Sequence, residues 1–245
     1  MDFVNLRTYN LSNSTTGKID FHAPLYRRKW ETDEIHTPNV DSIVNYWIDK
    51  GLSKSKLNVG IPFFGKSWIL ASSSIYPPSN AKATGDPGTY TAKRGLLAFY
   101  EICQDVRSRE LNPIRVINGN NMKEGLFAYK ERKIGSQWVT YDDPRMVKDK
   151  ATYIVEKQLG GAAVWDISLD DFRGACNLGT NPLLTAACET LKITTCVASS
   201  NTNQSTSTIS LFSTTSGSTK NIPKHYWLLV FLPFCLAFLL QNFFL

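Results

Sequence analysis

The sequence predicts an α/β fold built on a parallel sheet, and three segments near the N-terminus carry this prediction. Residues 2–9 (DFVNLRTY) alternate as a strand does, and residues 56–65 (KLNVGIPFFG) form a second β-rich run. Between them, residues 39–51 (NVDSIVNYWIDKG) place apolar side chains at the i, i+3, i+4 spacing of an amphipathic helix, which Gly51 ends. A strand, a helix and a strand at this spacing form a βαβ unit, whose two strands are parallel.

The middle of the chain predicts an α+β insertion. A helix is expected from Gly95 to Arg109, and a strand is expected at residues 67–73. Three further β-rich runs, at residues 114–119, 125–131 and 137–143, read as antiparallel pieces, of which the last two form a hairpin.

The pattern then returns to α/β. Residues 142–160 predict a helix that Asp142 or Asp143 caps, with Pro144 in its first turn. A strand follows at residues 160–167, and a short helix at residues 181–192.

The last part of the 245-residue chain has a different composition. Residues 193–225 are dominated by uncharged Ser and Thr, which predicts a solvated linker without a core of its own. Residues 226–245 are almost entirely apolar and approach the ~20 residues that span a bilayer. The small residues around Ser216, a polar spacer and this tail match a signal for lipid (GPI) attachment at Ser216; a single membrane helix is the alternative. Either interpretation predicts a membrane partner and an extracellular, surface-attached domain.

The cysteines and the N-glycosylation sequons are compatible with a secreted protein. Four cysteines precede the tail, and four thiols allow three pairings among Cys103, Cys176, Cys188 and Cys196. Glycosylation sequons begin at Asn10, Asn13 and Asn203. No signal peptide follows Met1, so we expect the chain to be incomplete at its front.

Other function classes are disfavoured. The sequence has no Cys-x-x-Cys motif and no His cluster, so we expect no metal and no cofactor. The net charge of +6 forms no basic stripe interleaved with aromatic residues, so we do not expect nucleic-acid binding. Three acids, Asp166, Asp170 and Asp171, follow the strand that ends near Trp165 and raise the question of a catalytic pair of carboxylates.

A family resemblance answers that question. The segments MDFVNLRTYNL, HAPLY, KLNVGIPFFGKSWIL, GLLAFYEIC, YDDPRMVKDKATYIVEKQLGGAAVWDISLDDFRGAC and NPLL occur in this order. Together they resemble the C-terminal part of a glycoside hydrolase family 18 chitinase. The resemblance implies a partial (β/α)8 TIM barrel with strands six to eight in residues 1–67 and 142–192, and a small α+β chitinase insertion domain in residues 68–141.

The resemblance also implies a function. Such chitinases cut chitin, a polymer of N-acetylglucosamine, by a retaining mechanism in which the substrate's own N-acetyl group is the nucleophile. Their general-acid Glu lies in a D-x-x-D-x-D-x-E motif, which does not occur in this sequence. We therefore expect a chitin-binding part of a chitinase-like protein, with hydrolysis only in a longer parent, and no catalytic residue in this chain. The alternatives are a non-catalytic, membrane-anchored chitin-binding lectin, and a fragment without a function of its own.

Residues that match the family's motifs imply a sugar-binding site. Trp165 would form the aromatic floor beneath the sugar, and the Tyr9 hydroxyl would hold the N-acetyl group. Five neighbouring positions depart from the family pattern and weaken the expectation of efficient hydrolysis: Arg7, Asn10, Phe64, Lys66 and Leu96. A glycan on Asn10 would obstruct the cleft.

The resemblance bears on the acids and the cysteines as well. It implies that the three acids after Trp165 are structural. It supports a Cys103–Cys176 disulfide and leaves Cys188 and Cys196 as the remaining pair.

Overall fold

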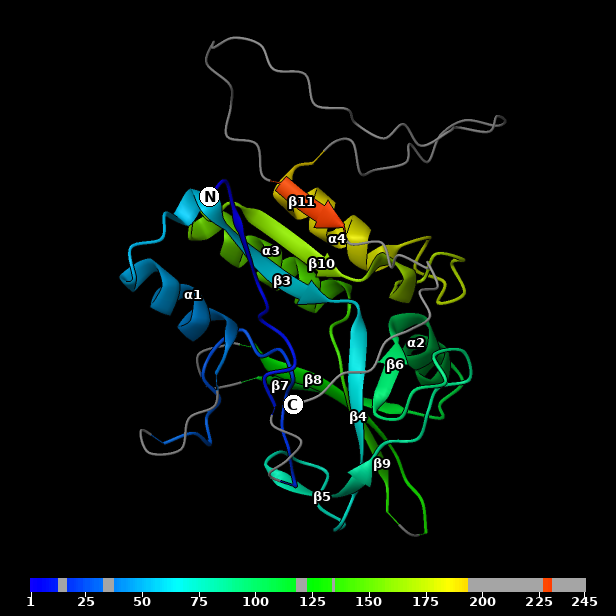
Figure 1. Cartoon of the computed structure of the whole chain (residues 1–245). Coiled ribbons are helices and arrows are strands. Elements are labelled where there is room, and N and C mark those ends of the chain that lie inside the picture. Colours follow the sequence, from blue (N-terminus) through cyan, green and yellow to red (C-terminus); the bar gives the residue numbers. More distant parts are fainter. Residues whose placement is uncertain (13–16, 33–37, 118–122, 134, 194–226, 231–245) are drawn as a thin grey trace, which may run out of the picture.

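The computed structural model describes residues 1–12, 17–32, 38–117, 123–133, 135–193 and 227–230. A four-stranded parallel sheet and a larger antiparallel sheet meet where β3 runs into β4 (Figure 1). The four-stranded sheet has the order β1-β3-β10-β11, and its strands are β1 (Val4–Leu6), β3 (Leu57–Pro62), β10 (Gly161–Trp165) and β11 (Trp227–Val230). All adjacent strands in this sheet are parallel, and the parallel pairing of β1 with β3 confirms the βαβ prediction.

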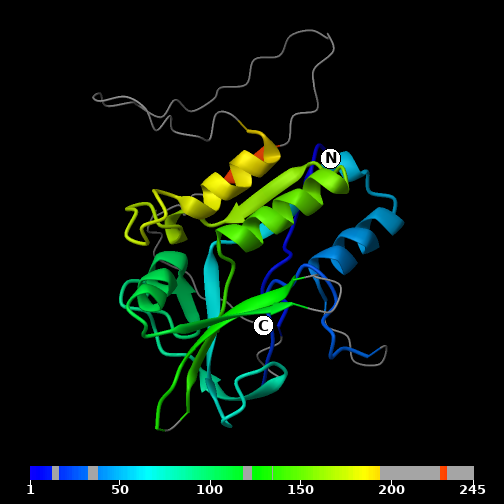
Figure 2. The same ribbon diagram turned by 180° about the vertical axis from the view of Figure 1, so that it is seen from behind.

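Three helices belong to this sheet. Figure 2 shows α3 and α4 lying side by side across one face of the strands. The helices are α1 (Val40–Asp49), α3 (Pro144–Glu156) and α4 (Pro182–Leu191), and a 3-10 turn, η2 (Lys54–Lys56), precedes β3. Asn39 caps α1 by accepting the Ser42 amide at 2.8 Å. Of the two caps considered for α3, Asp143 is the one that accepts an N-terminal amide.

The second sheet is antiparallel in all its described pairings. Its order is β2-β5-β4-β9-β8-β7, and β6 pairs with β4 outside this path. The strands are β2 (Lys18–Ile19), β4 (Phe64–Leu70), β5 (Ser79–Thr84), β6 (Leu96–Ala98), β7 (Asn112–Ile117), β8 (Lys123–Lys130) and β9 (Gln137–Thr140). The predicted antiparallel pairing of the last two β-rich runs is confirmed as β8–β9. The expected boundary at residue 67 falls inside β4.

The helix expected from Gly95 begins later than predicted. Leu96–Ala98 form β6, and α2 (Phe99–Arg107) starts at Phe99. Residues 96–98 pair with β4, and the Glu101 carboxylate accepts the Ala98 amide at 2.9 Å, which starts the helix there.

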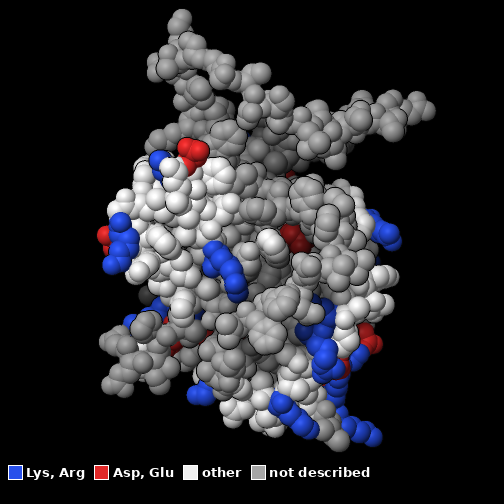
Figure 3. All heavy atoms as spheres, in the orientation of Figure 1, with Lys and Arg blue, Asp and Glu red and all other residues white. Residues whose placement is uncertain are grey.

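Two apolar clusters hold these layers together. The larger joins the four-stranded sheet to its helices and reaches α2, and its centre includes the fully buried Leu57, Val59 and Ile61 of β3. The smaller cluster packs on the antiparallel sheet around Trp68, Phe127 and Trp138. On the face in Figure 3, the described basic side chains lie in separate groups, several of them next to acidic side chains.

A partial barrel that contains only strands six to eight is expected to leave the strand beginning at Ala162 without a neighbour on one side. This expectation is wrong, because β11 pairs with β10 from Gly161↔Trp227 to Val164↔Val230. An open parallel edge presents unpaired N–H and C=O groups, and the apolar residues 227–230 suit a strand that satisfies them. β1 has β3 as its only strand partner among the described residues. No helix in the described ranges is long and apolar enough to cross a membrane.

Candidate functional site

The carboxyl ends of three parallel strands bring the predicted sugar-contacting residues to one edge of the sheet. Tyr9 follows β1, and Trp165 ends β10, where it lies in register with Pro62 at the end of β3. This is the end of the strands at which barrel enzymes carry their active sites. The topology therefore gathers residues that are more than 150 positions apart in the chain.

Trp165 is a large aromatic side chain that remains 46% exposed at this edge. Its backbone carbonyl accepts the Phe63 amide at 2.8 Å, which ties the end of β10 to the β3–β4 junction. The Trp165–Asp166 peptide is cis. The hydrogen bond from the Phe63 amide holds the backbone of Trp165, while the residue remains half-exposed to solvent.

Tyr9 is held by its neighbours in the sheet. The Thr8 hydroxyl donates to the Gly60 carbonyl at 2.7 Å, which fixes the chain next to Tyr9 against β3. The Tyr9 ring meets the buried Phe64 edge-on, with 5.8 Å between ring centroids. His22 packs on Phe64 in turn, at 5.2 Å between centroids. The ring of Tyr9 is therefore placed by contacts from two different strands.

Burial favours the protonated form of the Tyr9 hydroxyl. Burial raises the pKa of Tyr9, Arg7 lowers it in part, and the carboxylate of Asp166 raises it further. Because the group starts from a pKa near 10, the hydroxyl is a hydrogen-bond donor at neutral pH. Asp166 is held in place, since its carboxylate accepts the Ser168 amide at 2.9 Å.

Lys66 and Leu96 are brought together by strand pairing. Lys66 lies in β4 opposite Leu96 in β6. Burial lowers the pKa of Lys66, and the nearby positive charges of Lys93 and Arg7 lower it further. Lys66, Lys93 and Arg7 together make this side of the site cationic. It therefore suits ligands that accept hydrogen bonds and disfavours cations.

Asn10 has a left-handed backbone, with φ 57°. Its side-chain oxygen is buried and has no hydrogen-bond partner in the described structure. Glycosylation of Asn10 stays a prediction. Four other predicted positions lie outside the described residues: Asn13, Cys196, Asn203 and Ser216.

Asp170 and Asp171 organise the loop after β10. Asp170 accepts the amides of Leu183 at 3.2 Å and Leu184 at 2.9 Å at the start of α4. Asp171 accepts the amides of Ala175 at 2.9 Å and Cys176 at 2.7 Å. Burial raises the pKa of Asp170 to about 6 although backbone amides donate to it. The carboxylates of Asp170 and Asp171 thus accept hydrogen bonds from backbone amides and hold the loop in place.

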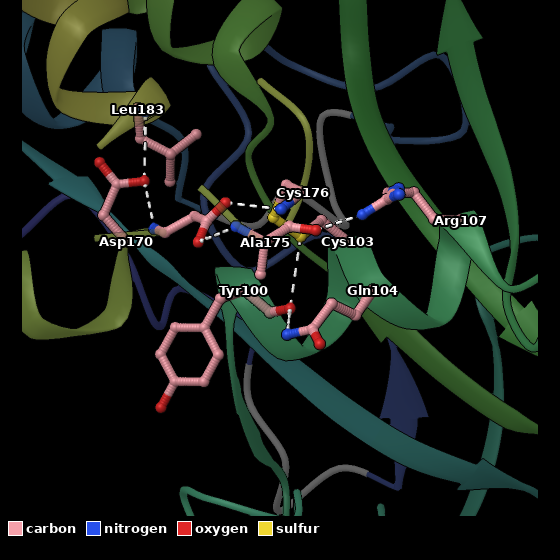
Figure 4. The surroundings of a disulfide bond; sticks show 9 residues. Tyr100, Cys103, Gln104, Arg107, Asp170, Ala175, Cys176 and Leu183 are labelled. Atoms are coloured by element: carbon pink, nitrogen blue, oxygen red, sulfur yellow. Dashed lines mark hydrogen bonds between the residues drawn. A yellow bond between two sulfur atoms is a disulfide. The ribbon is translucent and has the colours of Figure 1, made fainter. Parts of the chain in front are cut away.

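The Cys103–Cys176 disulfide is confirmed, with 5.7 Å between the Cα atoms (Figure 4). It joins α2 to the loop that Asp171 organises. Cys103, Asp171 and Cys176 lie close enough to resemble a metal site, but both sulfur atoms are already used in the disulfide. Cys188 is buried in α4.

Two residues of this site were not singled out from the sequence. His22 was visible only as part of the segment HAPLY, and nothing local indicates that it packs on Phe64. Gly60 lies where a Cβ atom would approach the Tyr9 ring to 2.9 Å, a long-range contact that the sequence does not reveal.

Comparison with known proteins decides the family. The model of glycosyl hydrolases family 18 matches residues 1–170. The chain belongs to this family. It is 38% identical to mouse (Mus musculus) chitotriosidase-1 over 188 residues, which is 75% of this chain and 37% of that protein.

Solved family 18 structures superpose on the chain. One is catalytic domain 2 of a group II chitinase from Ostrinia furnacalis in complex with an (NAG)5 oligosaccharide, with a TM-score of 0.70 and 36% identity over 78% of this chain and 48% of that one. Another is human YKL-39, described as a pseudo-chitinase with retained chitooligosaccharide binding, with a TM-score of 0.71 and 32% identity over 78% of this chain and 51% of that one.

The described fold is thus part of the family 18 TIM barrel. The chain spans 37% of chitotriosidase-1 and about half of these solved family 18 chains. Both a chitinase domain and a pseudo-chitinase are among the structures it resembles.

Proposed function

We propose that this chain is the sugar-binding portion of a chitinase-like protein and that it binds N-acetylglucosamine polymers at the edge carrying Tyr9 and Trp165. One observation carries the proposal: a half-exposed indole at the carboxyl end of β10 shares this edge with a tyrosine hydroxyl that stays protonated. The proposal agrees with relatives whose structures contain, or are described as binding, chitooligosaccharides.

The chemistry of the side chains suits an N-acetylated sugar. An indole face offers a large, rigid apolar surface to the C–H face of a pyranose ring. The Tyr9 hydroxyl can donate to an acetamide oxygen, and the ammonium group of Lys66 and the guanidinium of Arg7 supply further donors. In this proposal these residues bind and orient the sugar, and none of them is assigned a chemical step.

Two versions of the function differ in what completes the site. In a parent protein with the D-x-x-D-x-D-x-E motif, this portion would hold the sugar while a Glu from that motif protonates the leaving group. The alternative is a chitin-binding lectin without catalysis. Arg7, Asn10, Phe64 and Lys66 favour the lectin, because each replaces a residue that the chitinase pattern uses.

We further propose an extracellular location with membrane attachment that the apolar residues 226–245 direct. A lipid linked at Ser216 and a membrane helix are the two candidate forms of attachment. Because Trp227–Val230 pair with β10 in this structure, a membrane helix would require these residues to leave the sheet, and lipid attachment at Ser216 would remove them together with the tail. The division into barrel residues 1–67 and 142–192, insertion residues 68–141 and linker residues 193–225 is part of the same proposal.

Calorimetric titration of the purified chain with chitohexaose tests the binding. We expect saturable binding that Trp165→Ala weakens at least about tenfold, which corresponds to about 1.4 kcal/mol. Trp47→Ala is the matched control, because Trp47 is a 41% exposed tryptophan on α1 and not at the strand ends. Equal losses in the two variants, or no binding by the unmodified chain, would count against the proposal.

Product analysis separates the two versions. Incubation of chitohexaose with the chain alone should release no shorter sugars in either case. If the chain is extended by a natural upstream region, hydrolysis that depends on a Glu in that region supports the chitinase version, and binding without hydrolysis supports the lectin.

A further inference from the structure

A cavity of about 580 Å³ lies where α2, β7, β8, the start of α3 and the loop after β10 meet. Its volume falls within the roughly 300–1,000 Å³ of pockets that bind small molecules. We call it the arginine cavity, because the residues that line it include Arg107, Arg115 and Arg145. Neither Tyr9 nor Trp165 lines it, so it is separate from the edge at which we propose sugar binding.

The floor of the arginine cavity is apolar. It is lined by Phe99 of α2, Leu126 of β8 and Tyr141, whose side chains are all buried in the fold. Cys103 and Cys176 also line it, so their disulfide holds two of its walls together. Such a cavity is formed before a ligand enters, and it offers apolar surface that can remove a hydrocarbon group from water.

The rim carries more positive than negative charge. The three arginines line the cavity together with one carboxylate, that of Asp143. Asp143 forms an ion pair with Arg115 and also accepts the Met146 amide at 2.9 Å. In the described part of the chain, neither Arg107 nor Arg145 forms an ion pair. Two guanidinium charges are therefore left without a counter-charge beside an apolar surface, and both would attract an anion placed there.

Arg145 lies where a helix disfavours a cation. It is the second residue of α3, and the first turn of this 13-residue helix contains no acidic residue. The N-terminal end of a helix carries a partial positive charge, which favours anions and disfavours a guanidinium group. The position of Arg145 therefore adds to the positive potential over the cavity rather than to the stability of α3.

Arg107 and Arg115 present further donors. Nη1 of Arg107 donates to the Ala175 carbonyl, which extends the side chain from α2 toward the loop after β10 (Figure 4). A guanidinium group has five N–H donors, so others remain for a ligand. On Arg115, Nη1 is buried and has no hydrogen-bond partner in the described structure. A buried donor without a partner is unfavourable, and a turn of this side chain toward a bound anion would give it one.

We propose that the arginine cavity binds a small organic acid, with its carboxylate at the arginines of the rim and its apolar body on the buried floor. Guanidinium groups bind carboxylates through charge-assisted hydrogen bonds. The apolar floor selects an acid with an aliphatic or aromatic body over a bare ion. The inference goes beyond sugar binding and does not depend on it, because the two sites share no residue.

Calorimetric titration of the purified full chain with octanoate, 1-octanol and acetate tests both parts of the cavity. Octanol lacks the charge and acetate lacks the apolar body, so we expect octanoate to bind at least about tenfold more tightly than either. Equal affinities for octanoate and octanol would overturn the inference, and so would equal affinities for octanoate and acetate.

A charge-removing variant locates the carboxylate. Arg145→Gln should weaken octanoate binding about tenfold and leave the affinities for octanol and chitohexaose unchanged. Lys148→Gln is the matched control, because Lys148 is exposed on the same helix and does not line the cavity. It removes the same charge and should preserve the affinity for octanoate. Equal losses in the two variants would assign the effect to net charge and overturn the inference.

Photo-cross-linking shows where the apolar body lies. Octanoate with a diazirine at its terminal carbon should label peptides that contain residues 99–107, 126 or 141–145. Labelling confined to residues 226–245, or to the ends of β1 and β10, would overturn the inference and leave the proposed sugar binding intact. Competition with 2-naphthoate distinguishes the two kinds of body. Stronger displacement than by unlabelled octanoate indicates an aromatic acid, weaker displacement indicates an aliphatic one, and both results support the inference.

Discussion

The ring of Tyr9 lies over Gly60, the residue in the middle of β3 that has no side chain. A Cβ atom added at Gly60 would lie 2.9 Å from Cε1 of Tyr9 and 2.4 Å from the Leu6 carbonyl oxygen. Neither contact can be relieved by a flexible side-chain end, because one partner is a ring and the other is backbone. The absence of a side chain at Gly60 therefore allows β1 to pair closely with β3 and Tyr9 to reach its position.

Gly60→Ala should therefore lower both stability and sugar binding. Overpacking of this kind costs about 1–3 kcal/mol in the free energy of unfolding, which denaturant titration measures. Tyr9→Phe is the companion variant, because it keeps the ring and removes the hydroxyl, and it should weaken chitohexaose binding with little change in stability. If Gly60→Ala left the free energy of unfolding unchanged, β1 and β3 could move apart without loss of stability, and this explanation would be wrong.

The disulfide should contribute a large part of the stability. Cys103 and Cys176 are 73 residues apart, and cross-linking a loop of this length restricts the unfolded chain by about 4 kcal/mol in the chain-entropy model. The double variant Cys103→Ala/Cys176→Ala should lose roughly 2–5 kcal/mol in a denaturant titration. A reducing agent should destabilise the unmodified chain by a similar amount and should not affect the double variant. An effect of the reductant on both chains would assign it to other cysteines.

His22 should make the fold sensitive to acid. Burial lowers the pKa of His22 well below its usual value of 6.5, and Lys150 and Lys66 lower it further. Below pH 6.5, His22 therefore becomes protonated in the unfolded chain but stays neutral in the folded chain. The free energy of unfolding consequently falls as the pH falls, by up to about 1.4 kcal/mol per pH unit.

The comparison with His22→Asn isolates this contribution. Buried Asp142 and Asp170 have raised pKa values and act in the opposite direction, but they are present in both chains. The difference in stability between the unmodified chain and His22→Asn should therefore shift in favour of the variant between pH 7 and pH 5. Parallel pH profiles would contradict the assignment.

The pairing of β11 with β10 predicts where an apolar tail residue matters. Leu229 lies opposite Ala163, and Leu229→Pro removes a backbone N–H and should break the pairing. Amide exchange of residues 161–164 should then accelerate. Leu239→Pro is a control in the same apolar stretch but outside β11 and should leave that exchange unchanged. If residues 226–245 act instead as a membrane anchor, both variants should reduce membrane association and neither should affect residues 161–164.

The sequence was most informative where local patterns repeat. The helix periods, the cap predicted at Asp142 or Asp143 and the β-rich runs around β3 and β10 predict elements whose boundaries the structure places within a few residues. The start of α2 was missed because β6 is short and depends on pairing with β4, which no local pattern encodes.

Long-range contacts explain the other differences. A hydrophobic C-terminal stretch is a good membrane segment by composition, and its pairing with β10 depends on an open strand edge far away in the sequence. The roles of Gly60 and His22 arise likewise from neighbours more than 40 residues away. The resemblance implied the roles of Tyr9 and Trp165, whereas the cavity lined by Tyr90, Tyr100 and Phe172 depends on a fold that brings these three residues together.

The central claim is that this portion of a family 18 barrel recognises N-acetylated sugar chains. The most direct test titrates the purified chain with chitohexaose and with cellohexaose, which has the same β-1,4-linked backbone without acetamide groups. Stacking on Trp165 alone would accept both sugars, whereas a Tyr9 hydroxyl that donates to the acetamide requires the first. We predict saturable binding of chitohexaose at least about tenfold tighter than that of cellohexaose. Equal affinities, or no binding of either sugar, would contradict the account.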